Sequence, residues 1–191
     1  MKKTILSLAA TALVATSSFA IDTNDIYVGG GLSMVSLSGS GSDIDSGFAV
    51  VLNAGIPVLR IVEGSVLVEV ELSQTVSPLS STETDEEYNN ETDEYEETYR
   101  RNLDIDVFSI ALFAAYQYDI TNEYFVKARL GLISQSMDDG SETYDDTGLV
   151  YGIQAGYNLS QTMGLYVGVD MNSVNEYIDA QTITLGANYH F

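Results

Sequence analysis

Charged residues recur inside segments that are otherwise strongly apolar, and their spacing suggests ion pairing. Glu69 and Glu71 lie two residues apart, as do Lys127 and Arg129, and Asp170 lies in a third segment. In a β-strand residues i and i+2 point to the same face, so each pair projects together. A buried charge without a partner costs several kcal/mol. We therefore expect an ion-pair network in the interior that these segments enclose. The alternative is that these charges line a narrow, wet interior without direct pairing.

The sequence offers little for catalysis. His190 is the single histidine, and cysteine is absent. Hydrolysis would normally use a serine or cysteine activated by a histidine, but no Gly-x-Ser-x-Gly motif, Cys/His cluster or phosphate loop occurs. We expect a protein that is not an enzyme, with no catalytic residues, no cofactor and no specific metal site.

The charged pairs lie in segments that alternate with period two, which indicates strands with two different faces. Val66, Val68 and Val70 form an aliphatic stripe, and Glu69 and Glu71 lie opposite. In a soluble sandwich the valines would face the core, whereas in a membrane barrel they would face lipid and the glutamates the lumen. Eight such segments are expected, at 26–37, 48–56, 62–74, 103–118, 123–137, 149–159, 165–173 and 182–191, with Pro57 ending the second.

The phase of segment 103–118 stays open. If Asp104 and Asp106 face the lumen, strict alternation also turns Phe108 inward and Phe113 toward lipid. A bulge near Ser109, or acids placed at the rim of the barrel, would restore the usual polarity.

The connections between these segments alternate between long and short, which favours a barrel with all short turns on one side. The long ones are expected at 38–47, 75–102, 138–147 and 174–181, and the short ones near 57–61, 119–122 and 160–163. Residues 1–20 have the lysines, apolar run and small terminal residues of a cleaved signal peptide. We therefore predict an all-β protein: residues 21–191 form an eight-stranded antiparallel up-and-down transmembrane β-barrel.

Acidic residues are concentrated in the long connections, and the formal net charge of the chain is −21. This charge argues against nucleic acid as a partner. Clustered carboxylates attract hard divalent cations, although no loop has the spacing of a specific calcium site. The loops could therefore bind such cations or make surface contacts, or simply be solvated. The candidate acids are Glu86, Glu87, Asp93, Glu94, Glu96, Glu97, Asp138, Asp139, Asp145 and Asp146. The block at 75–102 is expected to be a solvated loop, mobile at its tip.

The last segment ends in Tyr189-His190-Phe191, with both aromatic residues on its apolar face. Aromatic side chains favour the level where hydrocarbon meets water, and Tyr116, Tyr118, Tyr124 and Tyr157 are expected there too. The signal peptide, the alternating strands and this ending resemble the OmpA/OmpX/opacity-type family of small outer-membrane β-barrels, without a peptidoglycan-binding domain. Tyr189 and Phe191 resemble the assembly signal of that class.

The resemblance implies export to the outer membrane of a Gram-negative cell and recognition by the barrel-assembly machinery. It also implies contact with outer-membrane lipid and lipopolysaccharide. The clustered loop carboxylates could bridge to lipopolysaccharide through Ca²⁺ or Mg²⁺, and the loops could contact host or phage surfaces. We expect a monomer. Three functions remain: a structural or surface-interaction barrel with a plugged lumen, a small cation-preferring porin-like channel, and a lipid-modifying enzyme. The absence of a catalytic constellation disfavours the last.

Overall fold

Strands make up nearly all of the described chain. The computed structural model describes residues 26–39, 46–89, 94–138, 140, 143–173 and 178–191, with backbone alone at 38–39, 81–89, 94–103, 173 and 178. The strands are β1 (Tyr27–Gly39), β2 (Gly47–Ile61), β3 (Gly64–Ser77), β4 (Leu79–Asn89), β5 (Glu94–Asp119), β6 (Tyr124–Asp138), β7 (Thr143–Asn158), β8 (Met163–Ser173) and β9 (Ile178–His190). No helix among these residues is long and apolar enough to cross a membrane.

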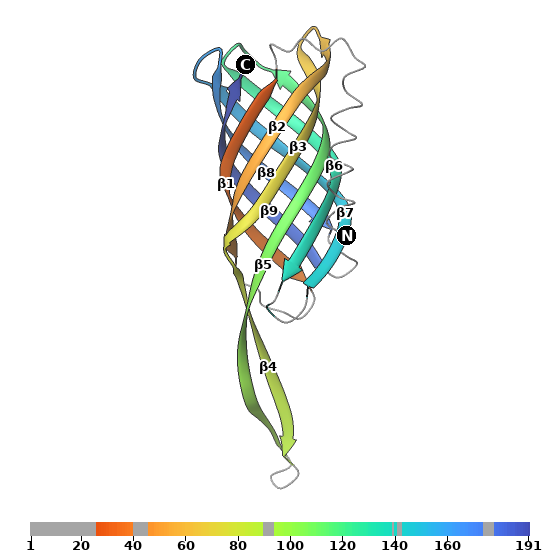
Figure 1. The fold of residues 1–191 in the computed structure, drawn as a ribbon, viewed down its shortest axis with the longest axis vertical. Helices are drawn as coiled ribbons and strands as arrows, with labels where there is room; N and C mark the ends of the chain where they lie inside the picture. The colour runs from red at the N-terminus through yellow and green to blue at the C-terminus, as the bar shows by residue number, and fades with distance from the viewer. Residues whose placement is uncertain (1–25, 40–45, 90–93, 139, 141–142, 174–177) are drawn as a thin grey trace.

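Eight of the strands close into an antiparallel barrel, which confirms the predicted fold (Figure 1). The order runs β3-β2-β1-β9-β8-β7-β6-β5, and β3 pairs with β5 to complete the ring. Closure removes the unpaired edges that an open sheet would expose. The turns at 62–63, 120–123 and 159–162 lie at the same end as Phe191, and we call this the turn end of the barrel. The opposite end, from which β4 extends, is the hairpin end.

The barrel has the reverse polarity of a water-soluble protein. Outward-facing aliphatic side chains are exposed, such as Leu32 at 63%, Ile153 at 67% and Leu185 at 69%. Inward-facing charged side chains are buried, including Glu69 at 2% exposed and Arg129 at 4%. Val66, Val68 and Val70 lie on the outward face of β3, opposite Glu69. The apolar surface thus faces outward, as a lipid environment requires.

The segment at 75–102 is not the irregular loop that we predicted. β4 pairs with the first part of β5, from Leu79 opposite Ile105 to Asn89 opposite Glu94. The two strands form a ribbon that extends well beyond the barrel (Figure 1). A block of acids lacks the apolar alternation by which strands are detected, but backbone pairing does not require it. The tip at 90–93 lies outside the described residues.

Other predicted boundaries also move. β6 extends to Asp138 and β7 begins at Thr143, so most of the predicted loop 138–147 is a paired hairpin. Pro57 does not end β2, which continues to Ile61. The register of β2 against β3 shifts between Pro57 and Leu59, and such a bulge accommodates a residue that lacks an amide hydrogen.

The phase of β5 is now determined. Phe113 is 2% exposed and Ala115 is 3% exposed on the lumen side, whereas Phe108 is 44% exposed on the outer side. The option that turned Phe108 inward is therefore wrong. The pairing of β5 with β6 is continuous from Asp106 to Asp119, which excludes a bulge near Ser109. Asp104 and Asp106 instead lie at the rim, which was the second alternative.

Candidate functional site

The five charged residues that we singled out project into the lumen from three strands. Glu69 and Glu71 come from β3, Lys127 and Arg129 from β6, and Asp170 from β8. β6 is separated from β3 by β5 alone and from β8 by β7 alone, and β3 and β8 lie on opposite sides of the ring. Because the side chain of Arg129 is long, it reaches carboxylates on both sides of the lumen.

The structure brings all five side chains together in direct ion pairs. Lys127 Nζ lies 2.6 Å from Glu69 Oε1, and Arg129 Nη1 lies 2.8 Å from Glu71 Oε2. Arg129 also contacts Asp170 in bidentate fashion, with Nε donating to Oδ1 at 2.6 Å and Nη2 donating to Oδ2. Glu69 Oε2 lies 3.9 Å from Arg129 Nη1 and links the two halves. A bidentate Arg–carboxylate pair fixes both groups in one geometry.

Aromatic side chains complete this cluster, and the sequence analysis did not assign them to it. The Tyr27 hydroxyl donates to Glu69 and accepts from Lys127 Nζ at 3.1 Å. Lys127 Nζ lies 4.8 Å from the centroid of the Tyr27 ring, and the Arg129 guanidinium lies 4.2 Å from that of Phe113. Such cation–π contacts stabilise desolvated cations. The available signal was the position of Tyr27 on the polar face of its strand.

Large inward side chains lie over glycines on neighbouring strands. A Cβ added at Gly55 would overlap the ring of Tyr27, and one at Gly156 would overlap Phe125. The ring of Tyr166 covers Gly186 in the same way, and its hydroxyl accepts from Asn53 Nδ2 at 2.8 Å. An eight-stranded barrel has an interior just wide enough for side chains to fill. The small residues therefore make room for the large ones.

The hairpin end of the lumen holds an apolar cluster that we did not predict. Leu79 and Ala49 are fully buried, and Val35, Leu37 and Ala180 pack with them. Ile105, Val107 and Met137 contact this cluster from the side. Leu79 is the first residue of β4, so the root of the hairpin contributes a side chain to the lumen. This apolar cap lies beyond the ionic cluster, toward the hairpin.

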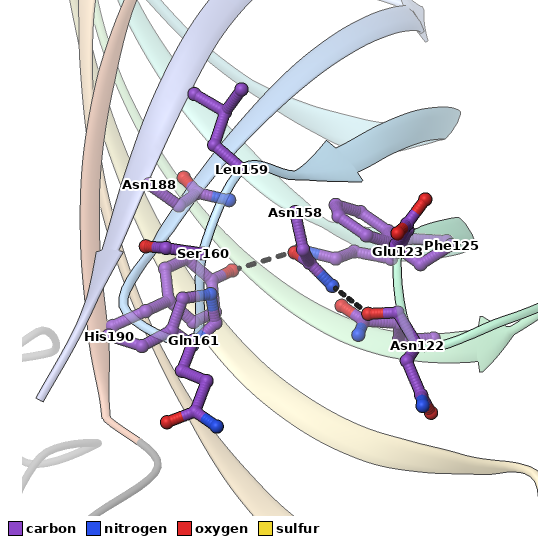
Figure 2. A pocket seen from close by; sticks show the side chains of 12 residues that line it. Asn122, Glu123, Phe125, Asn158, Leu159, Ser160, Gln161, Asn188 and His190 are labelled. Carbon is purple, nitrogen blue, oxygen red and sulfur yellow. Dashed lines mark hydrogen bonds between the residues drawn. The ribbon is translucent and has the colours of Figure 1, made fainter.

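The turn end of the lumen holds a cavity of about 490 Å³ (Figure 2). Its lining includes Tyr27 and Lys127 of the ionic cluster, so the cavity extends up to that cluster. Amide side chains and turn residues form most of the remaining wall. His190 also lines it, with its ring centroid 5.5 Å from that of Tyr27.

The candidate loop acids whose side chains the structure describes, Asp138, Asp145 and Asp146, do not form a metal site. Asp138, Asp145 and Asp146 lie in the β6–β7 hairpin, where Asp138 Oδ1 accepts from the amide of Gly140 at 2.8 Å. Glu86 and Glu87 lie in β4, in register with Glu97 and Glu96 of β5, and Glu94 begins β5. No group of three or more potential metal-ligating side chains occurs in the part of the chain that the structure describes. Asp93 and Asp139 lie outside that part.

The six aromatic residues that we expected at the membrane boundary lie at the turn end and are exposed on the outer face. Tyr189 is 46% exposed and Phe191 62% exposed, with ring centroids 5.2 Å apart in an edge-to-face arrangement. Tyr124 and Tyr157 form a second pair at 4.9 Å, and Tyr116 and Tyr118 are also exposed. Rings placed in this way suit the boundary between hydrocarbon and water.

Comparisons with known proteins agree with this architecture. Ail, the attachment invasion locus protein of Yersinia pestis, shares the fold at 17% identity, with 88% of this chain and 99% of that chain covered and a TM-score of 0.57. Neisserial surface protein A shares it at 19% identity, with 87% and 97% of the two chains covered and a TM-score of 0.55. OprG from Pseudomonas aeruginosa shares it at 15% identity, with 88% and 96% covered and a TM-score of 0.54. A search of curated proteins found no match. A family model for the outer membrane protein beta-barrel domain matches residues 6–191. The chain therefore belongs to that family and is a small eight-stranded outer-membrane barrel of the OmpA/OmpX type.

Proposed function

We propose that this protein is a non-enzymatic surface-interaction barrel of the Gram-negative outer membrane. Its β4–β5 hairpin would project from the cell and present negative charge to cationic partners. These include divalent cations that bridge to lipopolysaccharide, and basic patches on host or phage surfaces. The turn end would face the periplasm, since short turns lie on that side in outer-membrane barrels.

The paired hairpin is the observation that carries this proposal. It is a β-ribbon from Leu79 to Ile105 rather than an unstructured loop, so it can present a defined surface. Glu86 lies opposite Glu97, and Glu87 opposite Glu96. Like charges directly opposite each other destabilise a pair of strands. A bound cation or basic side chain would relieve that repulsion, and this predicts partners of positive charge.

The similar structures offer limited support. The name of Ail refers to attachment and invasion, and one of its structures holds the heparin analogue sucrose octasulfate. That ligand is a polyanion, whereas the hairpin of this chain is acidic. We therefore propose recognition at the hairpin end of this barrel, with partners of positive charge.

A lumen plugged by side chains would favour a surface role over the channel alternative. The ionic cluster crosses the barrel, and the apolar cap lies at the hairpin end. An ion that entered from the turn end would have to displace paired charges and then cross an apolar layer, and both steps are costly. In planar bilayers we expect no conductance steps, with a large porin as the positive control. Steady cation-selective steps from the folded protein would support the channel instead.

The cavity at the turn end does not favour hydrolysis. His190 and Ser160 both line it. However, Ser160 Oγ accepts hydrogen bonds from the backbone amides of Thr162 and Met163 at 3.2 and 3.1 Å. Such bonds stabilise a turn, so they give this side chain a structural role. We expect no release of fatty acid from lipid A or phospholipid.

Charge removal from the hairpin tests the surface role. The variant with Glu86, Glu87, Glu96 and Glu97 all replaced by Gln removes charge from residues that the register places opposite each other. The barrel would be reconstituted in nanodiscs and its binding measured to polylysine, and to lipopolysaccharide with and without Mg²⁺. We expect binding to both probes to weaken at least tenfold. A control, Glu63→Gln with Asp119→Asn, removes two exposed acids at the turn end, away from the ribbon, and should bind as wild type. Equal binding by all three proteins would refute the role.

A further inference from the structure

The cavity at the turn end has the chemistry of a small-molecule site, which the hairpin proposal does not explain. Its volume of about 490 Å³ lies within the range of ligand pockets, ~300–1,000 Å³. It is open at the end of the barrel and closed within by Tyr27 and Lys127. Figure 2 shows Asn188, Ser160 and His190 on one side of it and Asn158, Glu123 and Phe125 on the other.

The lining combines carboxamides with aromatic rings. The carboxamides belong to Gln117, Asn122, Asn158, Gln161 and Asn188, and the rings to Tyr27, Phe125 and His190. A carboxamide offers both donors and acceptors, which suits vicinal hydroxyl groups that do the same. Tyr27 and Phe125 are buried, at 3% and 4% exposed, so the half-buried His190 is the ring that can pack against the C–H face of a sugar. This combination fits a carbohydrate better than a purely apolar ligand.

Lys127 gives the cavity a buried donor at its inner end. The ammonium group has three N–H donors, and its described hydrogen bonds, to Glu69 and to the Tyr27 hydroxyl, use two of them. The side chain is 2% exposed. Glu69 already neutralises its charge at 2.6 Å. The remaining donor therefore suits a neutral acceptor, such as a hydroxyl or amide oxygen, better than a second anion.

The carboxylate of Glu123 also lines the cavity and adds negative charge. A negative group disfavours free phosphate or another small anion. From the lining, the charge balance and the volume, we propose that this cavity binds a neutral mono- or disaccharide from the periplasmic side. Its hydroxyl groups would contact the carboxamides and Lys127, and one ring face would pack against an aromatic side chain.

Side-chain amide resonances provide a direct test. The barrel in nanodiscs would be titrated with maltose, with N,N′-diacetylchitobiose and with inorganic phosphate while the NH₂ signals of Asn158, Gln161 and Asn188 are followed by NMR. We expect saturable shifts with at least one sugar and none with phosphate. No shift with either sugar up to its solubility limit would overturn the proposal, as would stronger shifts with phosphate.

Two asparagines allow a matched comparison. Asn188 lines the cavity, whereas Asn172 lies nearer the hairpin end, and both are 6% exposed. Asn188→Leu should weaken sugar binding about tenfold, the size of one neutral hydrogen bond. Asn172→Leu should leave it unchanged, and Gln161 shifts report binding in both variants. Equal affinities would overturn the assignment. The hairpin variant should bind sugar as wild type does, so this proposal and the surface role can fail separately.

Discussion

Replacement of Arg129 by methionine tests whether the lumen charges form a structural network. Arg129 is 4% exposed and contacts Asp170 and Glu71 directly. Methionine keeps much of the side-chain volume but removes the charge, so Glu71 and Asp170 would lose their closest described cation. Removal of one member of a buried ion pair usually costs ~3–5 kcal/mol, because the other charge stays buried without a partner.

The distances separate this outcome from that of a wet lumen. For the 2.8 Å contact between Arg129 and Glu71, the Coulomb attraction is about 6 kcal/mol at an effective dielectric constant of 20 but about 1.5 kcal/mol in bulk water. Only the attraction of about 6 kcal/mol is large enough for Arg129→Met to lower the free energy of unfolding by several kcal/mol once neighbouring side chains have partly relaxed. A hydrated lumen would screen the pair and reduce the loss to ~1 kcal/mol or less.

The measurement is the free energy of unfolding in lipid vesicles. It is obtained from urea titrations in which the folded fraction is read on a gel, where folded and unfolded barrels migrate differently. Arg60→Met removes the same charge from an exposed position at the turn end, where an ion pair contributes at most ~1 kcal/mol, and should change stability by no more than that. A triple variant that also carries Glu71→Leu and Asp170→Leu should recover most of the loss, because no unpaired charge remains. If Arg129→Met were as stable as Arg60→Met, the network would have no structural role.

Three further predictions address packing, assembly and the hairpin. Gly156→Ala should destabilise the barrel by ~1–3 kcal/mol, since the new methyl group would overlap the Phe125 ring. Gly164→Ala should cost less than ~1 kcal/mol, because its methyl group would lie 3.1 Å from the Asn158 carboxamide oxygen and 3.6 Å from the Tyr157 carbonyl oxygen. Urea titration compares the two variants. Phe191→Ala should slow folding that is assisted by the purified assembly machinery, because the machinery is expected to recognise this ring. Unassisted folding of the same variant into detergent should be slowed less. Equal slowing in the two assays would contradict recognition of this ring. Replacement of residues 81–101 by a short turn should leave a barrel with normal gel mobility and a free energy of unfolding within ~1 kcal/mol of wild type. The reason is that β4 pairs with β5 alone. Failure of this variant to fold would show that the ribbon is needed to close the barrel.

The sequence predicts the strand faces well because one physical rule determines them. Alternation correctly placed Glu69 and Lys127 in the lumen and Val68 outside, since each residue has a fixed side once the strand is recognised. It could not resolve the phase of β5, because Asp106 and Phe108 share a side and the sequence does not show where the membrane ends. The structure places Asp106 at the rim, where polarity on the outer side is tolerated.

Features that depend on pairing between distant segments were missed. The β4–β5 ribbon depends on register between residues such as Thr82 and Asn102, and an acidic block carries no periodic signal for it. The apolar cap was missed for a related reason. Leu79 follows Pro78 in a segment without alternation, and its position in the lumen follows from the hairpin that it begins.

The position of Leu79 gives the β4–β5 ribbon a mechanical link to the barrel. Its side chain is fully buried among Val35, Leu37 and Ala49, so the base of the ribbon is held by packing. A force that pulls on the ribbon would therefore act first on the residues of the apolar cap.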